Sequence, residues 1–380
     1  MNPINSRSDL ARARRLVIKI GSSSLTTADG RLDTEYLTRL VDTAAARRLR
    51  GHQVVLVTSG AIAAGLGPSG LARRPSDLAT SQALASVGQG LLIAEYARAF
   101  DRHGLTVGQV LLTAEDLIRP QHYRNARRAL TRLLELGMVP VVNENDAVAT
   151  DEIRFGDNDR LAALVANLVA AEVLVLLTDV DGLYTTRPTE PGARLVQRVH
   201  DADQLADYCI TGRGSAVGTG GMTTKIDAAM IATNSGIPTL LANASRVDDA
   251  LLGHEVGTWF DVADHRRSSR RLWLAWAARS RGRVWLDSGA VDAVTHGKRS
   301  LLAAGITQVE GDFEAGDAID LVGPGGHVVA RGLSGFDSAD VARMKGRSTV
   351  QLRVELDDFH ARPVVHRDDL APVLGGGRRG

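Results

Sequence analysis

The sequence predicts an α/β protein, a layered sandwich built on a parallel sheet, followed by a separate β-rich domain. Over the first two-thirds of the chain, short runs rich in β-branched residues alternate with helical patterns. Continuous apolar runs of this length are typical of parallel strands that are covered on both faces. The expected strands are residues 16–20, 54–57, 139–142, 173–177 and 239–242.

A helix is expected over residues 159–171, between two of these strands. Its apolar residues lie at helical spacing and form one face: Leu161, Leu164, Val165, Leu168 and Val169. Strands that alternate with such helices indicate a layered α/β fold. In these folds the ligand binds beyond the carboxyl ends of the strands. The residues directly after each strand are therefore the candidates for chemistry.

Composition and length limit the class of protein. Lys plus Arg number 45 and Asp plus Glu 44, a balance that does not indicate nucleic-acid or membrane binding. Cys209 is the only cysteine, so no internal disulfide can form, as is usual in a reducing cytosol. Residues 1–15 lack an apolar secretion segment, and the apolar runs are too short to span a membrane. We expect a cytoplasmic protein.

The chain of 380 residues is longer than one ordinary core, and its character changes near residue 264. Seven arginines fall within residues 264–283, and short strands separated by glycine turns follow. We expect an N-terminal extension (1–14), a large α/β domain (15–262), a basic linker (263–283) and a β-rich domain (284–375).

Small residues and glycines follow the expected strands. Examples are Gly21 to Ser24, Thr58 to Ala61, and Gly218 to Lys225 at the start of a later helix. Free backbone N–H groups at helix starts bind anions, so several such loops at one sheet edge predict a polyphosphate site. The last loop is not a Walker A loop, because Gly-Lys-Ser/Thr is missing at its end.

Lys19 lies inside the first expected strand. A buried lysine is costly unless it reaches a charged partner, so a lysine that points to the ligand edge indicates function. The alternative is a strand at the edge of the sheet, with Lys19 in solvent.

Acidic and amide side chains gather after the third expected strand and before the helix at 159–171. They are Asn143, Asn145, Asp146, Asp157, Asn158 and Asp159. Asp157 or Asn158 could simply cap the helix that follows. Capping and ligand binding are compatible, because one residue can cap while its neighbour faces the site.

Six segments carry a resemblance to a known family. They are IKIGSSSL (18–25), VTSGAIAAG (57–65), VPVVNENDAV (139–148), FGDND (155–159), LLTDVDGLYT (176–185) and GTGGMTTKIDAA (218–229). On these motifs, most of residues 15–260 resembles the glutamate 5-kinases of the amino acid kinase superfamily. Residues 284–313 resemble, more loosely, a PUA domain. The resemblance implies a three-layer αβα sandwich with a mainly parallel sheet, plus a small β-rich PUA-like barrel.

The resemblance implies transfer of the ATP γ-phosphate to the side-chain carboxylate of L-glutamate, giving L-glutamyl 5-phosphate in the first step of proline biosynthesis. It implies catalytic roles for Lys19, Lys225 and Asp159, with the aspartate between the two lysines. Glutamate would be held by Ser59, Asp146 and Asn158. ATP, with Mg²⁺, would be held by Lys19, Thr178, Asp179, Thr219, Gly220, Gly221, Met222, Thr223, Thr224 and Lys225. The chain departs from the family pattern at Val180-Asp181, which leaves the adenine contacts open.

The chemistry of a carboxylate acceptor suits these residue types. Glutamate is ionised at pH 7, so no general base is required, and none of the ten histidines falls in a site motif. The difficulty is that an anion must approach an anionic phosphate, and two fixed lysines would offset that repulsion.

The family also implies partners: proline as a feedback inhibitor, a homo-oligomer, and handover of the product to glutamate-5-semialdehyde dehydrogenase. Two alternatives remain at this point. One is a kinase for another small acid, carbamate or a phosphate monoester. The other is an RNA-binding protein, since PUA domains in other proteins bind RNA. Residues 284–380 carry 11 Lys/Arg and 14 Asp/Glu, a net of 11 − 14 = −3, which does not favour an RNA-binding surface on that domain.

Overall fold

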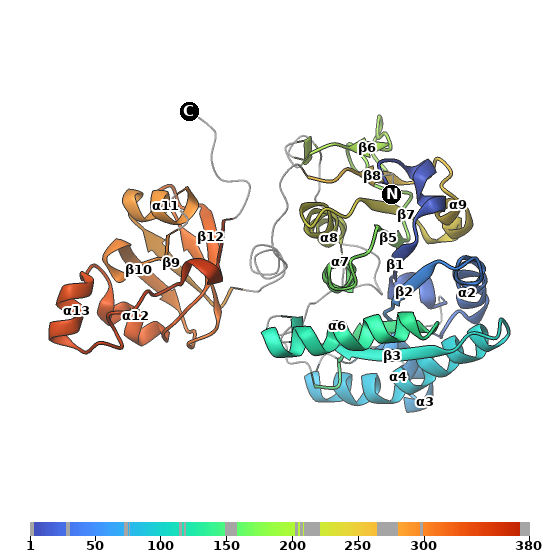
Figure 1. Cartoon of the computed structure of the whole chain (residues 1–380), viewed down its shortest axis with the longest axis horizontal. Coiled ribbons are helices and arrows are strands. Elements are labelled where there is room, and N and C mark those ends of the chain that lie inside the picture. The colour runs from blue at the N-terminus through green and yellow to red at the C-terminus, as the bar shows by residue number, and fades with distance from the viewer. Residues whose placement is uncertain are drawn as a thin grey trace. The chain divides into compact units, whose positions relative to one another are not determined.

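An eight-stranded sheet forms the centre of the N-terminal part of the computed structural model (Figure 1). The strands lie in the order β3, β4, β2, β1, β5, β7, β8, β6. Neighbouring strands pair in parallel except β7 and β8. The bounds are β1 (Arg15–Ile20), β2 (Gln53–Val57), β3 (Val107–Leu112), β4 (Val139–Glu144), β5 (Val173–Thr178), β6 (Arg198–Val199), β7 (Thr239–Asn243) and β8 (Thr258–Phe260). The prediction of a mainly parallel sheet is confirmed.

The structure describes residues 4–27, 31–71, 75, 77–113, 116–117, 119–148, 158–201, 204–205, 208, 221–263, 280–296 and 299–372. Internal contacts divide the chain into two units, residues 1–266 and 267–380. No helix in the described ranges is long and apolar enough to cross a membrane. Cys209, Thr219, Gly220, residues 155–157 and residues 264–279 of the expected basic linker lie outside these ranges.

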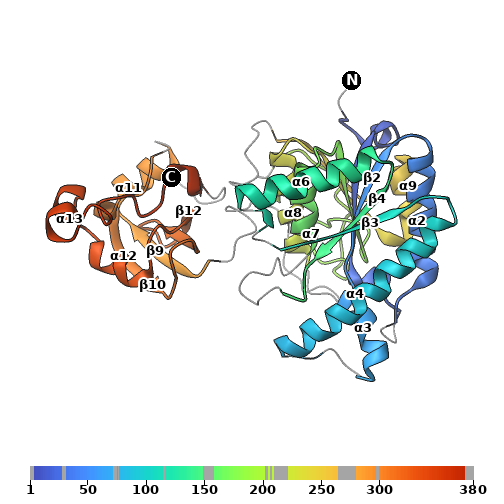
Figure 2. The ribbon, with the colours of Figure 1, turned by 60° about the horizontal axis from the view of Figure 1, so that its bottom comes forward.

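Helices cover both faces of the large sheet (Figures 1 and 2). One layer holds α2 (Thr34–Leu49), α4 (Leu78–Asp101) and α9 (Val247–Leu252), which share a core with β1, β2 and β5. The other holds α6 (Pro120–Glu135), α7 (Asn158–Leu168) and α8 (Met222–Asn234). Shorter elements are η1 (Arg7–Arg12), α1 (Ser22–Leu25), α3 (Ala61–Ser69) and η3 (Ala244–Arg246). The expected three-layer αβα sandwich is confirmed.

The helix expected over 159–171 is α7, and it ends earlier than its apolar pattern. Ala170 adopts a left-handed conformation with φ 50°. The Ala170 N–H donates to the Asn167 carbonyl (3.1 Å), and the Ala171 N–H to the Ala166 carbonyl (2.8 Å). These two bonds form a Schellman motif, which stops the helix although the apolar residues continue.

Three strands of the sheet were not predicted. The outer strand β3 contains Gly108 and Gln109, and only Leu112 of its residues is fully buried. The strands β6 and β8 are short, with two and three residues. None of the three has the long, continuously apolar character by which the buried central strands were recognised.

Lys19 lies on the central strand β1, which pairs with β2 on one side and β5 on the other. The lysine is 3% exposed, so the alternative of a solvent-facing lysine on an edge strand is wrong. Leu16, Ile18 and Ile20 belong to the core shared with α2 and α4. Because side chains alternate along a strand, Lys19 points to the opposite layer, which contains α7 and α8.

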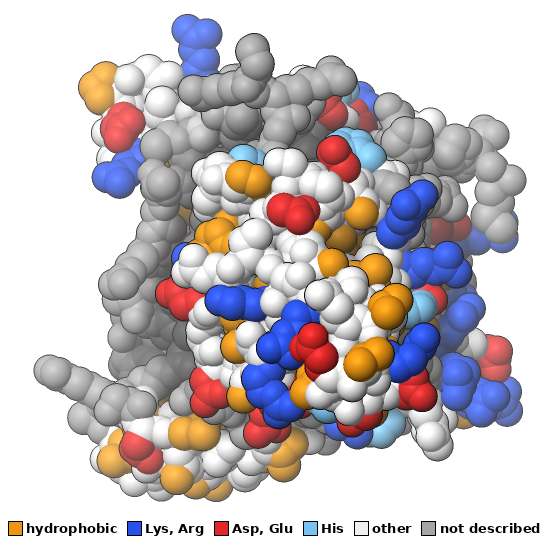
Figure 3. Space-filling view, turned by 90° about the vertical axis from the view of Figure 1, so that its left-hand side faces the viewer, with side chains coloured by type: hydrophobic (Ala, Val, Ile, Leu, Met, Phe, Trp, Pro, Cys, Tyr) orange, Lys and Arg blue, Asp and Glu red, His pale blue; other side chains and the backbone are white. Residues whose placement is uncertain are grey.

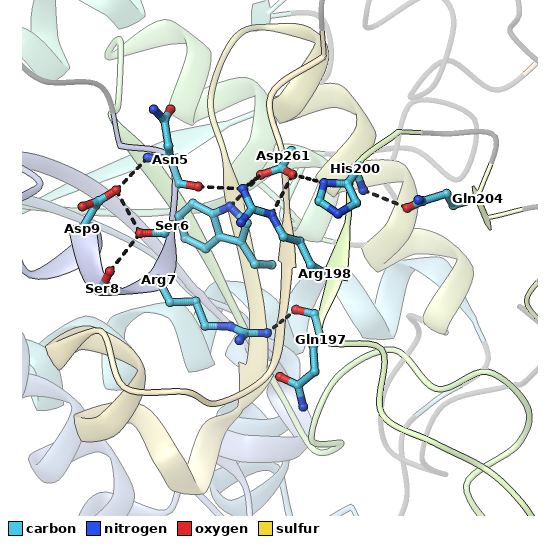
Figure 4. A network of polar contacts seen from close by, with 11 residues as sticks. Asn5, Ser6, Arg7, Ser8, Asp9, Gln197, Arg198, His200, Gln204 and Asp261 are labelled. Atoms are coloured by element: carbon cyan, nitrogen blue, oxygen red, sulfur yellow. Dashed lines mark hydrogen bonds and ion pairs between the residues drawn. The ribbon is translucent and has the colours of Figure 1, made fainter.

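The N-terminal segment before β1 is held against the β6–β8 side of the sheet (Figure 4). The Arg7 guanidinium donates to the Gln197 carbonyl oxygen. From β6, Arg198 donates to the Asn5 carbonyl (2.9 Å) and pairs with the Asp261 carboxylate (2.7 Å). These contacts join the expected N-terminal extension to the rest of the large unit.

A buried arginine links this segment to the helices α2 and α9 by hydrogen bonds. Arg47 of α2 is 6% exposed and donates to the carbonyl oxygens of Leu10 (3.0 Å), Ala13 (2.9 Å) and Leu251 (2.7 Å). Loss of water on burial lowers the pKa of Arg47 to about 10. The three carbonyl oxygens replace part of the lost hydration and tie η1 and α9 to α2.

Two glycines allow α3 and α4 to lie unusually close to each other, side by side in Figure 2. A Cβ on Gly65 would stand 2.2 Å from the Leu84 carbonyl oxygen, and one on Gly88 1.7 Å from the Ala61 carbonyl oxygen. Both obstacles are backbone atoms, so no side-chain rotation could relieve them. This contact sets the position of the middle of α4 relative to the end of β2.

The C-terminal unit has its own five-stranded sheet in the order β10, β9, β11, β12, β13. Its strands are β9 (Gly282–Leu286), β10 (Ile306–Gly311), β11 (Ala318–Val322), β12 (Val328–Leu333) and β13 (Leu370–Pro372). Its helices are α11 (Ser288–Thr295), η5 (Ala303–Gly305), α12 (Ser338–Met344), α13 (Thr349–Glu355) and η6 (Arg367–Asp369). A separate core around Val284, Ile319 and Val365 agrees with the expected independent domain.

We predict opposite effects for two alanine substitutions on α4. Gly88→Ala drives a Cβ into backbone and should lower the free energy of unfolding by about 3 kcal/mol. Gly90→Ala meets no atom within 4 Å and should raise it by about 0.5–1 kcal/mol, because alanine favours the helix. Urea unfolding of both variants measures the difference. Equal stabilities would contradict the close helix contact.

Candidate active site

A buried carboxylate lies between two lysines at the centre of the large unit. Asp159, on the first turn of α7, is 1% exposed. Its Oδ1 forms an ion pair with Lys19 Nζ, and its Oδ2 lies 3.2 Å from Lys225 Nζ. The Lys19 and Lys225 side chains are 4% and 11% exposed. Residues more than two hundred positions apart in sequence, 225 − 19 = 206, thus meet around one carboxylate.

The charges of these three residues do not cancel. Two ammonium groups and one carboxylate leave a net charge of 2 − 1 = +1 in a place with little access to water. Charge is costly to keep in such surroundings unless a counter-charge is close. The cluster is therefore suited to receive an anion, and one that presents several oxygens could contact both ammonium groups at once.

The start of α8 strengthens this preference for an anion. Gly221 precedes the helix, and Met222 and Thr223 occupy its first turn, where free N–H groups and the positive end of the helix dipole lie. Thr224 donates to the Gly221 carbonyl (2.8 Å) and to Asp159 Oδ2 (3.4 Å). These contacts join the helix start to the lysine cluster.

An amide network lies on the other side of the α7 start. The Asn158 Nδ2 group donates to the Thr58 carbonyl (2.5 Å), to Ser59 Oγ (3.0 Å) and to Asn143 Oδ1 (2.7 Å). Asn158 therefore links the ends of β2 and β4 to α7 and does not use its side chain to cap the helix. Asp157, the other capping candidate, lies outside the described residues.

Two further contacts fix the orientation of these amides. The Glu144 N–H donates to Asn143 Oδ1 (2.9 Å), so the Asn143 Nδ2 group faces Gln89 Oε1, at 2.6 Å. Asn158 must then donate from its Nδ2 group to Asn143. This orientation turns the side-chain oxygen of Asn158, Oδ1, away from the network. The network leaves Asn158 with a hydrogen-bond acceptor for some other group.

The remaining predicted residues lie at strand ends along the same edge of the sheet. Asp146 is half-buried in the turn after β4. Thr178, at the end of β5, is buried and donates to the exposed Asp179 carboxylate at 3.0 Å. The register of β5 with β1 pairs Leu177 with Ile20, next to Lys19.

Gln89 and Tyr96 of α4 also belong to this network and were not expected from the sequence. Tyr96 is fully buried, and its hydroxyl lies 3.0 Å from Thr58 Oγ1. Gln89 is 9% exposed and accepts from the Asn143 Nδ2 group at the end of β4. A signal was available, because Gln89 follows Gly88 within a helix, where glycine is disfavoured and indicates close packing.

The described residues offer no ready-made metal cage. They contain no group of three or more His, Cys, Asp or Glu side chains with a geometry that could hold a metal ion. Mg²⁺ usually binds proteins through one or two carboxylates together with substrate phosphates. Asp159 is already paired with two ammonium groups, so a magnesium ion at this place would take most of its oxygen ligands from a bound polyphosphate.

Comparison with known proteins identifies both units. The model of the amino acid kinase family matches residues 14–243, and that of the PUA domain matches residues 282–356. A glutamate 5-kinase of Thermobifida fusca is 56% identical over 98% of this chain and 96% of its own. One of Salinispora arenicola is 57% identical over 96% of this chain and 99% of its own. A glutamate 5-kinase of Frankia casuarinae is 58% identical over 95% of this chain and 97% of its own.

The family expected from the motifs is confirmed by matches that extend through both units. The chain belongs to the amino acid kinase family and, within it, to the glutamate 5-kinases, with a PUA domain at its C-terminal end.

Proposed function

We propose that this protein transfers the γ-phosphate of ATP to the side-chain carboxylate of L-glutamate, giving L-glutamyl 5-phosphate, the first step of proline biosynthesis from glutamate. The observation that carries the proposal is the buried Lys19–Asp159–Lys225 cluster with its net positive charge. The names of relatives that match nearly the full chain support the choice of substrate.

The two lysines would act on the transferring phosphoryl group. Glutamate is already ionised at pH 7, so the nucleophile needs no base. The barrier arises because one anion approaches another while negative charge spreads over the moving group. Lys19 and Lys225 would stabilise that charge from two sides. Asp159 would hold both ammonium groups in place, so that little reorganisation is needed during transfer.

ATP would lie along the carboxyl ends of β1, β5 and β7. The glycine loop before α8 would bind its phosphates with residues Thr219, Gly220, Gly221, Met222, Thr223 and Thr224, as anions are bound at other helix starts. Thr178 and Asp179 would contact the nucleotide at the end of β5. Mg²⁺, when bound with the nucleotide, would neutralise part of the charge of the phosphates.

Glutamate would bind on the amide side of the α7 start. The Asn158 carbonyl oxygen, turned away from the network, is suited to accept from the α-ammonium group. The Asp146 carboxylate would attract the same ammonium, and Ser59 Oγ would contact the substrate while it accepts from Asn158. Gln89 and Asn143 would hold these groups in orientation.

Several expectations from the sequence remain proposals. These are the cytoplasmic location, the homo-oligomer, inhibition by proline, and handover of the product to glutamate-5-semialdehyde dehydrogenase. We also retain residues 15–262 as the kinase domain and 284–375 as the PUA domain.

The described arginines of the PUA domain do not favour RNA binding, because most of them are paired with carboxylates. Five of them pair with carboxylates: Arg331 with Asp320, Arg343 with Asp340, Arg347 with Glu355, Arg353 with Asp358, and Arg367 with Asp368. In Figure 3 acidic side chains lie between the basic ones over the middle of the face shown. A phosphate backbone is normally met by a continuous basic surface. We therefore assign the protein an enzymatic role first.

The first test removes the lysines. The purified protein is incubated with ATP, Mg²⁺, glutamate and hydroxylamine, which traps the acyl phosphate as the γ-hydroxamate. Lys19→Ala and Lys225→Ala should each lower kcat by about a hundredfold or more, because each removes a fixed charge from the transition state. The exposed Lys345→Ala, in the C-terminal unit, is the matched control and should keep full activity. Near-normal turnover in either site variant would reject these roles.

The second test separates the two substrates. Asp146→Ala should raise the KM for glutamate by about tenfold or more, with a much smaller effect on the KM for ATP, because it removes one charged contact. Asn158→Asp should do the same, because its new oxygen faces the acceptors Thr58 and Asn143. Steady-state kinetics with each substrate varied in turn measures the split. Equal rises in both KM values would move these residues out of the glutamate pocket.

A further inference from the structure

A second ion pair joins α7 to α8 beside the lysine cluster, and the proposed reaction has not used it. Arg160, the neighbour of Asp159, pairs through its guanidinium with the Asp227 carboxylate of α8. Their side chains are 20% and 17% exposed, so both ends are largely shielded from water. Arg160 Nε is buried without a hydrogen-bond partner among the described residues.

The two ion pairs hold α8 on both sides of its buried stripe. Ile226 is 6% exposed and stands between Lys225 and Asp227. At 3.6 residues per turn, Lys225 and Asp227 are about 200° apart around the helix. Lys225 meets Asp159 on one side, and Asp227 meets Arg160 on the other. A helix held at two such points cannot roll about its axis without breaking one of the contacts.

Reversed charges make this arrangement specific. Along α7 the order is acid then base (Asp159, Arg160), whereas along α8 it is base then acid (Lys225, Asp227). A roll of α8 in either direction would therefore carry at least one of these charges away from its partner. A charge left without a counter-charge in a shielded place is costly. The observed orientation of α8 is therefore favoured over orientations that are rotated about the helix axis.

The precision needed at Lys225 makes the roll of α8 important. A side-chain tip lies about 6 Å from a helix axis, so a roll of about 20° moves it by about 2 Å. Displacements of about 1 Å at a reacting centre can cost about a hundredfold in rate. Lys225 Nζ is 3.2 Å from Asp159 Oδ2, so a 2 Å shift would remove it from the cluster.

We infer that the Arg160–Asp227 ion pair is a positioning device that fixes the roll of α8 and thereby aims Lys225 at the transferring phosphoryl group. Neither residue needs to contact a substrate. The inference rests on the proposed role of Lys225, and it adds two residues whose removal should weaken nucleotide binding and turnover together.

The test compares Arg160→Gln, Asp227→Asn and the double variant. Each single variant should lower kcat by about tenfold or more and raise the Kd for ATP, measured by calorimetry without glutamate, by about fivefold. The KM for glutamate should stay within about twofold of wild type, because the amide network is untouched. The double variant should be no worse than the singles, because all three lose the same contact. Arg160→Lys, which keeps the charge, should restore part of the activity.

A matched ion pair in the other unit separates positioning from simple stability. Arg331 and Asp320 have side chains that are 20% and 11% exposed, close to the values for Arg160 and Asp227. Arg331→Gln and Asp320→Asn should lower the Tm of the C-terminal unit while kcat and the Kd for ATP stay unchanged.

The outcomes distinguish this inference from the proposed function. If wild type forms γ-glutamyl hydroxamate but Arg160→Gln and Asp227→Asn keep wild-type kcat and ATP Kd, the positioning role is wrong and the proposed function stands. A fall in Tm alone, with unchanged ATP Kd, would equally overturn it. If wild type forms no hydroxamate with glutamate, the proposed function fails, and the ATP Kd of the variants still decides the positioning role.

Discussion

The arrangement of the large unit depends on one buried carboxylate. Asp159 is 1% exposed and is in contact with ammonium groups from β1 and α8. Without it, two lysines would repel each other in a place where water cannot screen them. With it, the cluster keeps a single net positive charge, which a phosphate can neutralise. The positions of β1, the start of α7 and the start of α8 must therefore stay fixed relative to one another.

Much of this could be predicted from the sequence. The buried parallel strands were recognisable from their β-branched runs, and the rule that ligands bind at strand ends directed attention to the loops that follow them. Lys19 could be singled out because a lysine within an apolar strand needs a partner. The partner itself came from the family resemblance. The sequence pattern of β1 contains no feature that indicates Asp159, which is 159 − 19 = 140 residues away.

The features that could not be predicted are contacts between elements far apart in the chain. Gln89 meets Asn143 across 54 residues, and Arg160 meets Asp227 across 67. Periodicity describes which face of a helix is buried, but not which polar residue of a neighbouring helix it will meet. The side-chain partners of Asn158 illustrate the same point. The sequence expected Asp157 or Asn158 to cap α7, whereas the Asn158 amide contacts Thr58 and Asn143 at the ends of two other strands.

In the proposed reaction, the start of α7 serves both substrates. Asn158 and Asp159 are consecutive, so they project about 100° apart around the helix. Asn158 turns toward β2 and β4, on one side of β1, whereas Asp159 turns toward β1 and α8. The chain passes from one half of the sheet to the other at this point, since α7 connects β4 to β5 across β1. Such a crossover opens a crevice at the strand ends, with one half of the sheet on each side. A phosphoryl donor held by the lysines and an acceptor held by the amides would therefore face each other across a single helix turn.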